Sequence, residues 1–384
     1  MSGMEKRREN RYASCSSYVD MARAACGAIM DRYDPPQLPP ASRWHYHQGV
    51  FLHGMIRLWE RTKEEPYYRY VRGYADHLID RNGNFLFSRD ELDAIQTGLL
   101  LFPLYRRSGD ARYRTAAQRL RHLFGTLNRT SEGGFWHKDK YPNQMWLDGL
   151  YMGGVFAATY AEAFGEAELF ALAVEQERLM RKDMKDPSTG LLYHAWDESR
   201  QAPWADPATG RSPEFWGRAI GWYGMAVADI AEKLPAGQEG REELIRSWRE
   251  LAAALVRYQD GATGLWHQIV DKAGRPDNWL ETSCSSLFVY TLAKGVADGH
   301  LDAACWDAAR RGYNGLLDRM AEDGEGRLVM PDICVGTSAG DYAHYVSRPR
   351  SENDLHGVGA FVLACLEMDR AAERMADSMY GKGE

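Results

Sequence analysis

The amino-acid sequence predicts an all-α protein in which six helical hairpins close into a ring, an (α/α)6 barrel. Two observations lead to this prediction. A unit made of a turn, a short extended segment and an apolar helix recurs along the chain, at residues 43–62, 83–109, 133–165, 189–234, 263–296 and 325–368. Helices of a second, amphipathic kind lie between the units. Such a regular alternation is typical of helical-repeat architectures.

The apolar helix that ends each unit is rich in Gly, Ala and Ser, as in "GLYMGGVFAATYAEAFG" from Gly149 to Gly165. A helix without a polar stripe is expected to be buried on all sides. We therefore expect these six helices to form an inner ring.

The helices between the units have one apolar and one charged side. In "AELFALAVEQERLMRKDM", residues 167–184, Leu169, Phe170 and Val174 share a side, and most charged residues lie elsewhere. We expect such helices to form an outer, half-exposed ring. An open α-solenoid is the alternative. No linker rich in Pro, Ser or Gly divides the chain, so one domain at 1–384 is expected, with a mobile N-terminal tail at about residues 1–15.

Composition excludes several function classes. The formal charge is −7, and no basic run exists beyond "EKRR" near Glu5, which argues against a nucleic-acid partner. No apolar run approaches the ~20 residues of a membrane helix, and no apolar segment of a secretion signal follows the N-terminus. The six cysteines lack metal-ligand spacing. Free buried thiols, no metal or other cofactor, and a cytoplasmic location are therefore expected.

Aromatic residues are abundant, with 12 Trp and 21 Tyr. Their rings stack on the faces of sugars, but they also fill cores, and the two explanations are about equally good on this feature alone.

The polar and aromatic residues just before each inner helix are expected to meet at one end of the ring and line one pocket. They are Tyr46, Asp93, Asp148, Trp216, Arg218, Glu281, Asn353 and His356.

Asp93 and Asp148 occupy matching positions in successive units. Two carboxylates in one aromatic pocket suit general acid–base chemistry. Simple capping of two helices is the alternative, and the two explanations have similar weight. The apolar neighbours of Asp148 are expected to exclude water, so that its carboxyl holds a proton at neutral pH.

Several cationic side chains accompany the acids. His137 and Lys138 precede Asp148, and His194 occupies the matching stretch of the next unit. Arg218 lies between Trp216 and Trp222, where its guanidinium suits a carboxylate or the edge of a sugar. Stacking on Trp to hold a turn is the structural alternative for Arg218.

Three long motifs, "QMWLDGLYMGGVFAATYAE", "SPEFWGRAIGWYGMAVADI" and "SRPRSENDLHGVGAFVLA", resemble the unsaturated rhamnogalacturonyl hydrolases of glycoside hydrolase family 105. The resemblance extends from about Trp44 to Leu366. It implies an (α/α)6 barrel that acts on a small oligosaccharide ending in a 4,5-unsaturated uronic acid. In this reaction an acid protonates C4 of the enol ether, water adds at C5, and the hemiketal breaks down to release the next sugar.

The resemblance also implies roles for individual residues. Asp148 is the general acid and base, and Asp93 binds substrate and tunes its partner. His194 and Arg218 hold the unsaturated sugar. The walls and subsite contacts are Tyr46, His137, Lys138, Met152, Trp216 and Trp222.

Three alternatives to this function stay open. The substrate is an unsaturated glucuronide instead, or Asp93 and Asp148 act as acid and base in inverting hydrolysis of a saturated glycoside. The third is a helical-repeat scaffold that binds a ligand without catalysis.

Overall fold

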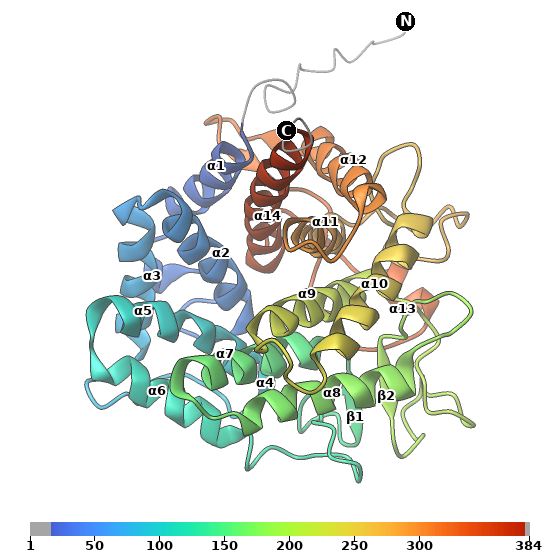
Figure 1. Cartoon of the computed structure of the whole chain (residues 1–384), viewed down its shortest axis with the longest axis horizontal. Helices are drawn as coiled ribbons and strands as arrows, with labels where there is room; N and C mark the ends of the chain where they lie inside the picture. The colour runs from blue at the N-terminus through green and yellow to red at the C-terminus, as the bar shows by residue number, and fades with distance from the viewer. Residues whose placement is uncertain (1–16, 381–384) are drawn as a thin grey trace, which may run out of the picture.

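The computed structural model describes residues 17–380, and helices dominate it. Six inner segments surround the centre of the ring (Figure 1). They are α2 (Tyr46–Thr62), α4 (Leu92–Thr97) continued by α5 (Leu101–Ser108), α7 (Val155–Phe164), α9 (Gly217–Lys233), α11 (Thr282–Ala297) and α14 (Leu355–Tyr380). The outer helices are α1 (Tyr18–Met30), α3 (Glu65–Leu78), α6 (Ala111–Leu123), α8 (Glu168–Met184), α10 (Arg241–Tyr258) and α12 (Ala303–Arg319). The fold is the predicted (α/α)6 barrel.

Burial separates the two rings as the hydrophobic patterns predict. Every residue of the inner helix α11 from Thr282 to Val296 is buried. The outer helix α10 buries only one side, with charged residues on the other. The inner ring therefore forms the core of the barrel, and the outer ring shields it.

The last inner helix closes the ring. Helix α14 packs against α11 on one side and against α2, the first inner helix, on the other. Two glycines allow this close approach. A methyl group at Gly359 would lie 2.6 Å from the backbone of Phe51, and one at Gly54 would lie 3.2 Å from the carbonyl oxygen of Gly359. This contact excludes the open solenoid, in which the first and last repeats lie far apart.

Tight turns return the chain from several outer helices to the inner ring. In the turn after α10, Asp260 accepts hydrogen bonds from the amide and hydroxyl of Thr263, and Gly264 has a φ of +75°. A side chain at Gly264 would also strike the carbonyl oxygen of Arg311, so glycine is required there. Asp323 holds the turn after α12 in the same way, through the amides of Glu325 and Arg327.

Short antiparallel strand pairs follow some of these turns: β1 (Gln144–Trp146) with β2 (Ala195–Asp197), β3 (Ala321–Glu322) with β4 (Leu328–Val329), and β5 (Ile333–Cys334) with β6 (Arg350–Ser351). Met145 pairs with Trp196 in the β1–β2 register. A short helix, α13 (Tyr342–Val346), lies in the loop between β5 and β6. These segments lie at the end of the barrel where the inner helices begin.

Other expectations concern the rest of the chain. Between residues 17 and 380, no helix is both long and hydrophobic enough to cross a membrane. The cysteines in this range are buried free thiols, as predicted: Cys26, Cys284, Cys305, Cys334 and Cys365. Cys15 and the tail at residues 1–15 lie outside the described residues.

The seam between α14 and α2 gives a stability prediction. Gly359→Ala places a methyl group against the backbone of Phe51 and should lower the free energy of unfolding by about 1–3 kcal/mol, because helix backbones cannot move apart cheaply. Gly27→Ala, in the interior of α1, is the control, since a methyl group there meets no atom within 4 Å. It should leave stability unchanged or raise it by up to about 1 kcal/mol. Urea unfolding measures both, and equal effects would contradict the packing argument.

Candidate active site

A cavity of about 210 Å³ opens where the inner helices begin. Eight of the ten predicted site residues line it: Tyr46, Asp93, His137, Lys138, Asp148, Met152, Trp216 and Arg218. His194 lies behind Asp148 and is fully buried. Trp222 is buried too, stacked on Tyr151 with ring centroids 5.0 Å apart. The cavity therefore brings together residues from four different units.

Glu281, Asn353 and His356 occupy the matching positions of the last units but lie outside the lining. Glu281 caps α11 and accepts the amide of Cys334 at 2.8 Å. Asn353 bonds the backbone of Met330. His356 contacts Arg218 from behind.

Asp148 owes its position to the β1–β2 pair. Asp148 follows β1, and the amide of Leu147 donates to the carbonyl of His194 just before β2. The pairing brings Nε2 of His194 to 3.3 Å from Oδ2 of Asp148, although the two atoms form no aligned hydrogen bond. Among residues 17–380, no backbone amide donates to the Asp148 carboxylate, so it caps no helix.

The charge state of Asp148 differs from the sequence expectation. Burial acts to raise the pKa of its carboxyl, but His194, His137 and Arg218 outweigh burial and bring the pKa below its usual value. The free protein therefore holds Asp148 as a carboxylate at neutral pH. The expectation that apolar neighbours keep it protonated was wrong, because His194, His137 and Arg218 together stabilise the carboxylate more than burial destabilises it.

Tyr345 determines which nitrogen of His194 carries the proton. The Tyr345 hydroxyl oxygen accepts the amide of Gly340 at 3.1 Å and lies 2.6 Å from Nδ1 of His194. Its own proton is therefore directed at Nδ1. Burial lowers the pKa of His194, so the ring is neutral and its single proton sits on Nε2, facing Asp148. No sequence pattern pointed to Tyr345, which lies in α13.

Asp93 is an anion held by cations. The Lys138 ammonium contacts its carboxylate closely, and Nε2 of His45 lies 3.5 Å away. Burial acts to raise the pKa of Asp93, but the hydrogen bond from His45 and the charge of Lys138 hold it far below its usual range. The two acids thus do not divide one proton between them. Asp93 is kept ionised chiefly by Lys138 and His45, and Asp148 by His194, His137 and Arg218.

Arg218 holds a loop of the last unit against the cavity. Nη1 donates to the carbonyl of Cys334, Nη2 donates to that of Val335 at 2.7 Å, and the guanidinium stacks 4.5 Å from the Trp216 ring. This is the structural alternative foreseen for Arg218. Nε–H and one Nη2–H stay available to a ligand, so both roles are compatible.

An aromatic platform forms one wall. The Trp146 ring stacks between His137, with centroids 4.3 Å apart, and Tyr141, 4.7 Å apart. Eight further lining residues were not among the predicted site residues: His45, His47, Lys140, Tyr141, Trp146, Gly336, Thr337 and Ser338. The density of Trp and Tyr signalled the platform, but nothing in the sequence placed the 336–338 loop over the cavity.

Two groups of histidines and acids within residues 17–380 are close enough to suggest metal sites. In the first, of His47, Asp354 and His356, Arg218 donates to Nε2 of His356, whose proton must then lie on Nδ1 and prevent that atom from binding a metal.

The second group is His45, Glu91 and Asp93. The Lys138 ammonium already occupies it, in contact with Asp93 and 3.8 Å from Glu91. Hydrogen bonds and ion pairs therefore explain why the side chains of both groups lie close together.

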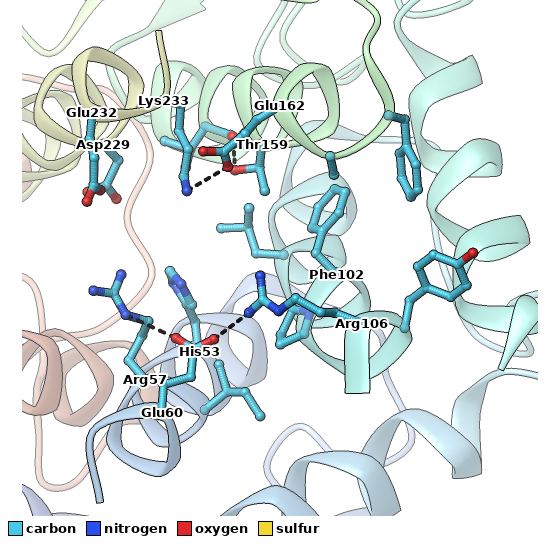
Figure 2. A pocket seen from close by; sticks show the side chains of 17 residues that line it. His53, Arg57, Glu60, Phe102, Arg106, Thr159, Glu162, Asp229, Glu232 and Lys233 are labelled. Atoms are coloured by element: carbon cyan, nitrogen blue, oxygen red, sulfur yellow. Dashed lines mark hydrogen bonds and ion pairs between the residues drawn. The ribbon is translucent and has the colours of Figure 1, made fainter. Parts of the chain in front are cut away.

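A larger cavity, of about 670 Å³, lies towards the opposite ends of the inner helices (Figure 2). Its charged side chains pair with one another. Lys233 lies 2.8 Å from Glu162, and Arg106 lies 2.7 Å from Glu60. It contains none of the predicted site residues. We therefore identify the smaller cavity as the candidate active site.

An (α/α)6 barrel with carboxylates in an aromatic pocket has the features of a carbohydrate-active enzyme. Comparison with known proteins agrees. Residues 21–372 match the model of glycosyl hydrolase family 88. A solved family 105 glycoside hydrolase of C. acetobutylicum is 36% identical, with a TM-score of 0.86 over 92% of this chain and 99% of that one. The chain belongs to these related families, 88 and 105, and is thus a glycoside hydrolase.

Two curated relatives extend the comparison. The unsaturated rhamnogalacturonyl hydrolase YesR of Bacillus subtilis is 27% identical over 321 residues, which cover 82% of this chain and 87% of the relative. Protein Atu3128 of Agrobacterium fabrum is 34% identical over 230 residues, 56% of this chain and 97% of that protein.

The pairing of Asp93 with Lys138 predicts a pH dependence of stability. Because the pKa of Asp93 is lower in the folded than in the unfolded protein, its contribution is complete above about pH 4 and is lost as the pH falls below that value. Asp93→Asn should therefore lower the free energy of unfolding by about 3 kcal/mol at pH 7, and this difference from wild type should shrink between about pH 5 and pH 2.

Asp229→Asn is the control for that measurement, because burial raises the pKa of Asp229 to about 6. A raised carboxyl pKa has the opposite sign, so wild type should lose stability relative to this variant as the pH rises from about 4 to 6. Urea unfolding across the pH range measures both slopes. A cost of Asp93→Asn that stays constant with pH would contradict the ion pair.

Proposed function

We propose that the chain acts as one (α/α)6 domain that removes a 4,5-unsaturated galacturonyl residue from the non-reducing end of rhamnogalacturonan-type oligosaccharides. One observation carries the proposal: Asp93 is held by Lys138, so that among residues 17–380 Asp148 is the single lining carboxylate that no lysine binds. Ordinary glycoside hydrolysis needs two working carboxyl groups, whereas hydration of a double bond needs one. The name of the Bacillus subtilis relative supports the same substrate.

One carboxyl group, that of Asp148, is enough for every proton transfer of the hydration. The Asp148 carboxyl donates its proton to C4 of the enol ether, and positive charge develops at C5 and the ring oxygen. Water adds to C5 and returns a proton to the Asp148 carboxylate. The hemiketal then opens to a ketone at C5, and C1 becomes a hemiacetal that expels the next sugar as an alcohol. Asp148 ends the cycle in the state in which it began it.

The first step requires a protonated Asp148, and substrate binding favours that protonation. Asp148 is ionised in the free protein, with Nε2–H of His194 beside it. A bound uronate brings a second carboxylate into the cavity and displaces water, and both changes raise the pKa of Asp148. Lys138 and the remaining N–H groups of Arg218 attract the uronate carboxylate. The rings of Trp146 and Trp216 face the sugar, and Met152 completes the wall.

The unsaturated ring alone does not determine whether the substrate is a galacturonide or a glucuronide. These two sugars differ at C4, and the double bond removes that stereocentre. Preference must therefore arise where the next sugar binds, at the open side of the cavity near Lys140 and Tyr141.

The decisive variant is Asp148→Asn. It should fold normally but lose about 100- to 10,000-fold in turnover of an unsaturated galacturonyl-rhamnose disaccharide, because an amide cannot relay the proton. Loss of the ultraviolet absorbance of the conjugated uronate measures turnover.

Asp229→Asn, which changes a buried acid at the opposite cavity, is the matched control and should keep wild-type activity. If wild type leaves the absorbance unchanged, the substrate assignment is wrong. If wild type is active and Asp148→Asn equals it, Asp148 is not the acid.

A further inference from the structure

A chain of hydrogen bonds runs behind the candidate site and joins three inner helices. Tyr46 and His47 begin α2, Asp354 and His356 lie at the start of α14, and Arg218 lies in α9. The Tyr46 hydroxyl is 2.9 Å from Nε2 of His47, whose Nδ1 is 3.0 Å from Oδ1 of Asp354. Nδ1 of His356 is 2.8 Å from the same oxygen, and its Nε2 is 3.0 Å from Nη1 of Arg218.

Arg218 fixes the protons at one end of the chain. A guanidinium only donates hydrogen bonds, so Nε2 of His356 must accept. The proton of the neutral ring then lies on Nδ1 and is donated to Asp354. Burial acts to raise the pKa of Asp354, but the hydrogen bonds from His356 and His47 hold it far below its usual range, so Asp354 is an acceptor only.

The proton positions of His47 and Tyr46 follow from those of Asp354 and His356. Burial lowers the pKa of His47 to about 4, so the ring carries one proton at neutral pH. Asp354 attracts that proton to Nδ1, which leaves Nε2 of His47 as an acceptor. The Tyr46 hydroxyl must then donate to Nε2 of His47. Its own proton is used, and since Tyr46 lines the cavity, its oxygen can serve a ligand only as an acceptor.

We propose that His47, Asp354 and His356 are positioning residues that fix the Tyr46 hydroxyl as a hydrogen-bond acceptor, and that this acceptor selects a sugar with a free hydroxyl at the facing ring carbon. The proposal rests on the proposed function for its ligand, a hydroxylated sugar ring. A purely structural role, in which the cluster only ties α2 to α14, predicts the same distances but no link to substrate. Two measurements separate these possibilities.

The first measurement needs no substrate. NMR of the full chain labelled with ¹⁵N-histidine reports which ring nitrogen of each histidine is protonated. His47 and His356 should both carry the proton on Nδ1, whereas His194 should carry it on Nε2. Resonances are assigned by single replacement of each histidine. A proton on Nε2 of His47 at neutral pH would overturn the proposal, whatever the enzyme turns over.

The second measurement is a double-mutant cycle between Tyr46 and His47. In His47→Asn the side-chain amide takes the place of Nδ1 and still donates to Asp354, but no atom remains to accept the Tyr46 proton. This variant should lower kcat/KM on the unsaturated disaccharide about 10-fold, mainly through KM. The freed Tyr46 hydroxyl can then turn its proton towards the sugar, where the oxygen should accept a hydrogen bond. In the Tyr46→Phe background the same replacement should have no further effect.

His47→Gln is the rescue variant, since its amide oxygen lies near the place of Nε2 and can accept from Tyr46. It should retain more activity than His47→Asn. His53→Asn, on the same helix at the opposite cavity, is the control and should keep full activity. Additive losses in the cycle, or equal losses in the Asn and Gln variants, would assign His47 a structural role and overturn the proposal. Inactivity of wild type would instead reject the proposed function and leave the NMR result to decide the proton arrangement.

Discussion

The barrel closes through a backbone contact between its last inner helix, α14, and its first, α2. Without a side chain at Gly54 or Gly359 the two helix backbones approach closely, and the last repeat closes onto the first. Closure aligns the beginnings of all inner helices at one end of the barrel. It also brings Asp354 of the last unit within hydrogen-bond distance of His47 of the first. The seam that completes the fold therefore also completes the wall of the candidate site.

The three acids at the candidate site differ in the groups that bind them. Lys138 neutralises Asp93, and Asp354 accepts hydrogen bonds from two histidines. Only Asp148 faces the cavity with a neutral histidine as its nearest partner. A buried carboxylate without a cation in direct contact is the group whose pKa responds most to a charged ligand. In the proposed mechanism this difference lets Asp148 take up a proton when substrate binds, while Asp93 and Asp354 stay ionised.

Repeats and hydrophobic periodicity were enough to predict the barrel and the end at which the site lies, because both follow from local patterns that recur in each unit. They were also enough to bring Asp93 and Asp148 together. The protonation of Asp148 was not predictable, because it depends on His194, which the β1–β2 register brings close. The partners of Arg218 lie 116 and 117 residues further along the chain, and Tyr345 lies 151 residues beyond His194. No pattern within one unit carries such distant pairings.

In the proposed reaction, one acid protonates the double bond and water adds to it before the glycosidic bond breaks. Turnover of the unsaturated disaccharide in D₂O, followed by NMR at early times, tests this directly. We expect one deuterium at C4 of the released sugar, on a single face, because Asp148 in D₂O carries a deuteron and delivers it from one side. Product made in water and then transferred to D₂O corrects for exchange next to the ketone. If the released sugar holds no deuterium at C4 beyond that introduced by exchange, or holds it equally on both faces, then Asp148 does not deliver a proton to C4 from one side.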